Sequence, residues 1–132
     1  MRNSAKVWWS LSLEDIDVAR ELHEIGRFSN AVIFHSQQAA EKGLKACFEE
    51  KELDIPKIHS CKKLISILYK AKVILSYDDD DLDQLDEVYI DTRYPSNLGE
   101  LPKGKPTQSD AAHFLLISER ILKGVETFLF EC

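Results

Sequence analysis

Hydrophobic residues recur at spacings of three and four positions along most of this chain, which is the period of an α-helix. No segment alternates apolar and polar residues for long enough to form a strand. The spacing therefore predicts an all-α fold, an up-and-down bundle of about five helices. The expected helices cover roughly 8–25, 28–51 and 60–71, then a fourth from 78–81 to about Tyr94, and a final one that begins at Ser109 or Asp110.

The first two predicted helices carry the broadest apolar surfaces. Gly26 is the expected stop of the first helix. The second helix is apolar on more than one face and contains several small residues, which places it in the middle of the bundle. In it, Glu41 and Lys45 form a favourable pair one turn apart. The inward stripe of the first helix is Trp8, Leu11, Val18, Leu22 and Ile25; the second helix offers Phe28, Val32, Ala39, Gly43 and Ala46 on one face and Ile33, Ala40, Leu44 and Cys47 on another.

Capping and breaking residues separate the remaining helices. Ser60 is a candidate N-cap of the third helix, and the aspartates of 78–81 suit the positive end of the dipole of the fourth. Pro95 disfavours helix at the residue before it, so the fourth helix ends there. Residues 95–107 then form an irregular loop of a length that is often functional in compact domains.

The composition describes one ordinary soluble unit. A chain of 132 residues is expected to form a single domain over 1–132. The three cysteines have no CxxC spacing, which argues against a disulfide framework or a zinc site and indicates a reducing, cytoplasmic compartment. No apolar run approaches the roughly 20 residues of a membrane span, so no membrane association is expected.

The negative charge is concentrated in one segment. Net charge is −6, but residues 78–91 hold eight acidic side chains and no basic one, so the rest of the chain carries −6 + 8 = +2. The negative net charge is therefore compatible with a basic face elsewhere that binds nucleic acid. The acidic run lacks the spacing of a calcium loop, and we expect no metal and no cofactor.

Four segments, in order, resemble the HEPN domain family, named for higher eukaryotes and prokaryotes nucleotide-binding. They are "DIDVARELHEIGRFSNAVIFHSQQAAEKGLKA" at 15–46, "IPKIHSCKKLISIL" at 55–68, "YIDTRYP" at 89–95 and the final amphipathic helix. The resemblance spans nearly the whole chain. It implies a helical bundle that is usually a homodimer and often works with a minimal nucleotidyltransferase protein, a pairing commonly read as a toxin–antitoxin system.

Some relatives are metal-independent ribonucleases, and here the chain departs from their pattern. That branch is marked by an arginine, four to six intervening residues and a histidine, and none of the five arginines of this chain satisfies the spacing. A histidine and an arginine from different helices can still meet in space, as His35 and Arg93 lie on different predicted helices.

Several residues are candidates for a polar cleft, each with a structural alternative. Arg93 either bonds the last carbonyls of its helix or grips an anion through its planar fork. Tyr94 either packs or stacks on a base, and His35 and His59 are either satisfied structural residues or ligands. Lys42 is expected to be solvated. The candidate nucleotide- or anion-binding residues are Arg93, Tyr94, His35, Gln38, His59, Lys103 and Lys105.

Three functions remain open at this point. The first is a dimeric regulatory protein that binds a nucleotide or RNA and works with a nucleotidyltransferase. The second is a ribonuclease in which a histidine acts as general acid or base and Arg93 stabilises the phosphorane-like charge. The third is a purely structural assembly module.

Overall fold

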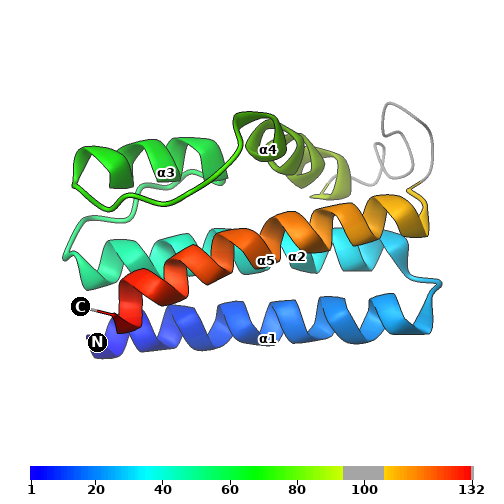
Figure 1. Cartoon of the computed structure of the whole chain (residues 1–132), viewed down its shortest axis with the longest axis horizontal. Helices are drawn as coiled ribbons and strands as arrows, with labels where there is room; N and C mark the ends of the chain where they lie inside the picture. Colours follow the sequence, from blue (N-terminus) through cyan, green and yellow to red (C-terminus); the bar gives the residue numbers. More distant parts are fainter. Residues whose placement is uncertain (94–105, 132) are drawn as a thin grey trace.

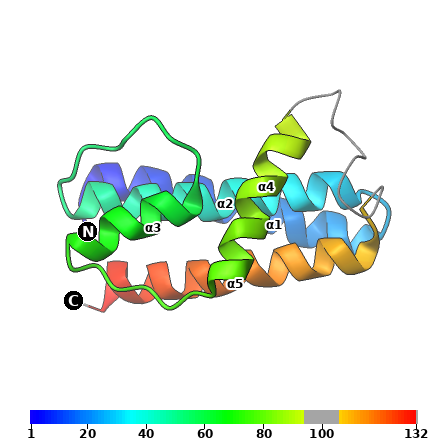
Figure 2. The ribbon, with the colours of Figure 1, turned by 90° about the horizontal axis from the view of Figure 1, so that it is seen from above.

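A computed structural model describes residues 1–93 and 106–131, the side chains of 89–93 excepted, and contains no strand in that part of the chain. The helices are α1 (Asn3–Ile25), α2 (Ser29–Glu50), α3 (Cys61–Lys70), α4 (Asp79–Arg93) and α5 (Gln108–Phe130). The three long helices α1, α2 and α5 lie side by side, and the shorter α3 and α4 cover one side of them (Figure 1). Seen from above, α4 crosses α2 obliquely (Figure 2). The predicted all-α bundle is confirmed.

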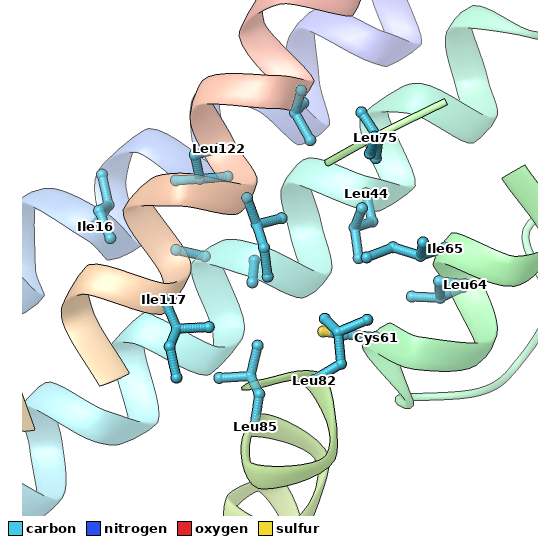
Figure 3. Packing of buried hydrophobic residues seen from close by; sticks show 14 of the residues in the cluster. Ile16, Leu44, Cys61, Leu64, Ile65, Leu75, Leu82, Leu85, Ile117 and Leu122 are labelled. Carbon is cyan, nitrogen blue, oxygen red and sulfur yellow. The ribbon is translucent and has the colours of Figure 1, made fainter. Parts of the chain in front are cut away.

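The central place of α2 is also confirmed. This helix contacts each of the other four, and its aliphatic side chains meet those of α3, α4 and α5 around Leu44 (Figure 3). Its small residues allow close approach. A Cβ atom on Gly43 would lie 2.5 Å from Cδ2 of Leu122 and 3.2 Å from Oγ of Ser12, so α5 and α1 leave no room for a side chain there. Phe28 was expected to face inward with them, but it precedes α2 and is 40% exposed.

The buried stripe of α1 differs from the expected one. The helix begins at Asn3, and the residues it buries at intervals of three and four positions include small and polar ones. Leu11 and Ile25, expected inside, are 40% and 58% exposed. Small residues of α1 form its contact with α2 because they let the two helices approach closely. At this contact Oγ of Ser12 donates a hydrogen bond to the carbonyl of Ala39 at 2.7 Å. The buried residues are Ala5, Trp9, Ser12, Asp15, Ile16 and Ala19.

Helix ends follow local chemistry. Gly26 ends α1 at φ 82°, a conformation that glycine adopts without strain. Asp78 caps α4, since its Oδ1 accepts from the backbone N–H groups of Asp80 and Asp81. The last helix is capped by Thr107, and neither Ser109 nor Asp110 is its N-cap. Asp110 instead accepts from the N–H of Thr107, which completes a reciprocal capping box.

The start of α3 is held by two elements. Ser60 caps it as predicted, its Oγ accepting from the N–H of Lys63 at 3.1 Å. Asp86 of α4 adds a tertiary cap, accepting from the hydroxyl of Ser60 and from the N–H of Cys61. A carboxylate at this position also suits the positive end of the α3 dipole. The contact ties the α3 N-terminus to α4.

The two cysteines in the described residues, Cys47 and Cys61, are free and buried. Cys47 lies in the core as predicted, and burial, with a smaller contribution from Glu50, raises the pKa of its thiol to about 12. Burial likewise raises the pKa of the Cys61 thiol well above its usual range. No helix in the described ranges is long and apolar enough to cross a membrane.

Candidate nucleic-acid interface on helix α2

One line of half-buried polar side chains runs along α2, which otherwise packs against its neighbours on most sides. We call it the α2 polar stripe: His35, Gln38, Lys42 and Lys45. Spacings of three, four and three residues place these side chains above one another on one side of the helix. Since α5 meets α2 at Ser36 and Gly43, the stripe projects from a different side of α2 than the one α5 covers.

The first part of the stripe is organised by Asp15 of α1. Oδ1 of Asp15 lies 2.8 Å from Nδ1 of His35, and Nζ of Lys42 donates to Oδ2 of Asp15 at 2.6 Å. The carboxylate is largely buried, with 12% of its side chain exposed, whereas His35 and Lys42 keep 32% and 26% of theirs. We call these three residues the Asp15 network. Lys42, expected to be solvated, is thus paired.

The Asp15 contact determines which nitrogen of His35 carries the proton. An ionised carboxylate only accepts hydrogen bonds, so Nδ1 of His35 must donate. In the neutral ring, Nε2 then presents a lone pair, and within the described residues it has no hydrogen-bond partner. The Phe34 ring lies beside it, with 5.2 Å between the ring centroids. His35 can accept a proton from a ligand at Nε2, and Phe34 offers a face for a base.

The second network is centred on Glu41; its carboxylate and its lysine are nearly buried, whereas its histidine, His59, keeps 49% of its side chain exposed. Nζ of Lys45 donates to Oε2 of Glu41 at 2.8 Å, which confirms the predicted pair. Gln37 donates to Oε1 at 3.2 Å, and Nδ1 of His59 lies 3.1 Å from Oε2. Only 6% of the Glu41 side chain and 11% of the Lys45 side chain are exposed. We call these four residues the Glu41 network; it joins α2 to the segment before α3.

The structure therefore separates residues that the sequence grouped together. His35 bonds Asp15, whereas His59 bonds Glu41, which lies about 9 Å from His35 along the axis of α2. Gln38 lies between them and donates to Oε1 of Gln37 at 2.7 Å. The stripe brings His35 and Gln38 to one surface.

Most of the remaining predicted site residues lie outside the part of the chain that the structure describes. Arg93 is the last residue of α4, and its side chain is not among those described. Tyr94, Lys103 and Lys105 lie outside the described residues. Their roles stay predictions. Close to His59 in the chain, Lys62 donates to Asp83 at 2.9 Å, a bond that raises the pKa of Lys62.

Asp15 is the functional candidate that the sequence reasoning missed. A signal existed: it is a carboxylate within the buried face of α1, between Ser12 and Ile16, where an unpaired charge would be costly. The sequence does not show which residues pair with Asp15, because Lys42 is 27 residues away along the chain.

Comparison with known proteins identifies the fold class. The HEPN domain family matches residues 5–128, and the chain therefore belongs to the HEPN domain family. Among solved structures, TT1696 from Thermus thermophilus is similar, with a TM-score of 0.79 and 27% identity over 95% of this chain and 98% of that one. An archaeal HEPN homologue, ST0689, has a TM-score of 0.71 and 24% identity over 98% of this chain and 99% of its own. No curated protein matches.

Proposed function

We propose that this HEPN protein is an RNA- or nucleotide-binding regulator that acts as a homodimer beside a nucleotidyltransferase partner, in a pair of the toxin–antitoxin type. The observation that carries the binding role is the open Asp15 network on the α2 polar stripe. It combines a histidine of defined tautomer, a lysine with N–H groups left over after its bond to Asp15, and a neighbouring aromatic ring.

Those three groups match the three parts of a ribonucleotide. Lys42 can direct its remaining N–H donors to a phosphate, and a base can stack on Phe34. Nε2 of His35, as an acceptor, suits a 2′-hydroxyl, which is the group that separates RNA from DNA. Arg93, Tyr94, Lys103 and Lys105 stay candidate anion-binding residues in this proposal. The geometry thus favours single-stranded RNA over DNA.

The test is fluorescence anisotropy with a labelled RNA of about ten nucleotides and a DNA of the same sequence. The wild type is expected to bind RNA more tightly, and His35→Gln to weaken RNA binding about ten-fold. The matched control is His113→Gln, an exposed histidine of α5 bonded to Gln84. Equal affinity of the wild type for RNA and DNA would show that His35 does not recognise the 2′-hydroxyl. An equal loss of RNA affinity in His35→Gln and His113→Gln would show that His35 does not contact the RNA.

The Asp15–His35 pair also favours a second function, RNA cleavage without metal. In that reaction Nε2 of His35 takes the proton of a 2′-hydroxyl, whose oxygen attacks the adjacent phosphorus. The bond to the 5′-oxygen breaks, that oxygen takes a proton from water, and a 2′,3′-cyclic phosphate results. Lys42 stabilises the charge on the phosphorane oxygens. Cleavage that survives a chelator and stops with a 2′-deoxy residue at the scissile position would support it; tight binding with no product supports the regulator.

Exposed apolar side chains on α1 support the homodimer part of the proposal. The apolar faces of α2 pack against the other helices of the same chain. Exposed apolar side chains instead lie along α1 at helical spacing: Val7, Leu11 and Ile25 are 60%, 40% and 58% exposed. Light scattering is expected to give twice the 15.1 kDa chain mass, and Leu11→Glu to shift it toward the monomer. A wild-type mass of one chain refutes the dimer.

A further inference from the structure

A series of hydrogen bonds connects the buried Glu41 to the surface of α2 through two glutamines. The Glu41 carboxylate is paired with the Lys45 ammonium and only accepts hydrogen bonds, so the group of Gln37 that lies 3.2 Å from its Oε1 is the amide nitrogen. The carbonyl oxygen of Gln37 then accepts from Nε2 of Gln38 at 2.7 Å. An amide can present either its oxygen or its nitrogen to a neighbour, and here the carboxylate determines the orientation of both amides.

The middle of this series is buried, whereas its end is not. Gln37 is 1% exposed and Glu41 is also buried, so neither can exchange its partner for water without a cost. Gln38 is half-buried, and among the described residues its Oε1 and its second N–H have no partner. No buried side-chain oxygen or nitrogen in the described ranges lacks a hydrogen bond, so Oε1 of Gln38 is accessible to solvent. Gln38 therefore offers one acceptor and one donor, in an orientation fixed from the core.

Gln38 lies beside the groups of the RNA site proposed above. It comes three residues after His35 and four after Phe34, which places the three side chains on one side of α2. Side chains at these spacings have Cβ atoms about 5–6 Å apart, a distance that a glutamine side chain can span. A base that stacks on the Phe34 ring would therefore bring one of its edges close to the amide of Gln38.

We propose that Gln38 recognises the base in this site and selects adenine, and that Gln37 is the positioning residue that orients its amide. The proposal rests on the RNA-binding role and adds to it the identity of the base. Oε1 of Gln38 accepts from the N6 amino group of adenine, and the free N–H of Gln38 donates to the neighbouring ring nitrogen. Glutamine is suited to adenine because the two can form these two hydrogen bonds at once.

The other bases match the amide of Gln38 less well. Adenine has its amino donor between two ring acceptors, N1 and N7, so it offers a donor beside an acceptor on both its Watson–Crick and its Hoogsteen edge. Guanine presents two acceptors, O6 and N7, on the Hoogsteen edge, which leaves only its Watson–Crick edge. Uracil and cytosine also match on one edge only, and their single ring covers less of the Phe34 ring than a purine does.

The test is fluorescence anisotropy with an RNA of about ten uridines and with versions in which one central uridine is replaced by adenosine, guanosine or purine riboside. Purine riboside stacks as adenosine does but lacks the N6 amino group. Wild type is expected to bind the adenosine RNA about ten-fold more tightly than the purine riboside RNA, with the guanosine RNA between them. In Gln38→Met, which keeps the length of the side chain, these two RNAs should bind equally.

A second variant, Gln37→Met, tests the orientation of the amide. It removes the link between Glu41 and Gln38, while Glu41 keeps its other partners. The preference for adenosine over purine riboside should fall part of the way toward equality, because Gln38 can then present either end of its amide. Affinity for the all-uridine RNA should not change, a separation that a purely structural role of Gln37 would not produce.

The matched control is Gln84→Met, which replaces an exposed glutamine of α4 that bonds His113 and should bind every RNA as wild type does. Urea unfolding checks that each variant is folded. Equal affinity of wild type for the adenosine and purine riboside RNAs would overturn the proposal, as would a preference for adenosine that Gln38→Met retains. A full preference in Gln37→Met would remove the positioning role of Gln37.

The RNA-binding role fails by a different result. If wild type binds none of these RNAs at about 1 mM, that role and the selection of adenine are both refuted. If wild type binds RNA more tightly than DNA of the same sequence but does not distinguish adenosine from purine riboside, RNA binding stands and only base selection by Gln38 is refuted.

Discussion

The Asp15 and Glu41 networks use the same chemistry in two different settings. Each has one carboxylate that holds a lysine and a histidine through Nδ1. The lysine of the Glu41 network is 11% exposed, and that of the Asp15 network is 26% exposed. The nearly buried Glu41–Lys45 ion pair makes the Glu41 network a structural connection between α2 and the segment before α3, although His59 in it is 49% exposed. The more exposed Lys42 of the Asp15 network can exchange its partner for a ligand.

The largest expected effect in this comparison is the loss of Glu41. Glu41→Ala leaves the Lys45 ammonium nearly buried without its carboxylate, a change that costs about 3–5 kcal/mol. Urea unfolding should show this loss, whereas Glu49→Ala, a half-exposed carboxylate on the same helix, should change the free energy of unfolding by less than about 0.5 kcal/mol. Glu41→Leu combined with Lys45→Met should recover most of the loss. Equal effects of Glu41→Ala and Glu49→Ala would contradict the stabilising role of the buried Glu41–Lys45 pair.

A smaller loss of stability and a larger loss of binding are expected at Asp15. In Asp15→Ala the freed side chains of His35 and Lys42 can turn to water, so the free energy of unfolding should fall by only about 1–2 kcal/mol. RNA affinity should fall about ten-fold because the tautomer of His35 is no longer held. Urea unfolding and fluorescence anisotropy, measured on one preparation, check the predicted changes in stability and in RNA affinity. A stability loss as large as that of Glu41→Ala, with unchanged RNA affinity, would make Asp15 structural as well.

The smallest effect on stability is expected at Lys42. Its ion pair is partly exposed, so Lys42→Met should change the free energy of unfolding by about 0.5 kcal/mol or less. If Lys42 contacts one phosphate, the salt dependence of RNA binding, plotted as log K against log salt, should lose about 0.7 of slope. Lys45→Met should leave that slope unchanged and cost more stability, because it removes the lysine that pairs with the nearly buried Glu41 carboxylate. Identical slopes in wild type and Lys42→Met would place the phosphate elsewhere.

Much of the secondary structure was predictable because its signals are local. Gly26 ends α1, Ser60 caps α3 and Asp78 caps α4, and each acts within four residues of its own position. The cap of α5 was misplaced because Thr107 and Asp110 form a reciprocal pair, and only the geometry shows which of the two precedes the helix. Errors of this kind are confined to helix ends.

The candidate site was predictable only in part. His35 and Gln38 were chosen as polar residues of an otherwise apolar helix, and they do share one half-exposed surface. Asp15 was missed, and His59 was grouped with His35 although it belongs to the other network. Spacing along one helix is visible in a sequence, but the partner across a helix pair depends on how the two helices are rotated and aligned.

The sequence by itself determined the class of this protein: an all-α bundle, the order of its helices, most of their ends and its membership of the HEPN family. Only the tertiary structure decided which stripe of α1 became buried, which carboxylate each histidine bonds and which glycine was needed. Gly43 and Gly124 are alike in the sequence, yet one lies against Leu122 and the other lines a cavity. The physical reason is range: hydrogen bonds and caps act over a few residues, whereas packing depends on side chains brought together from distant parts of the chain.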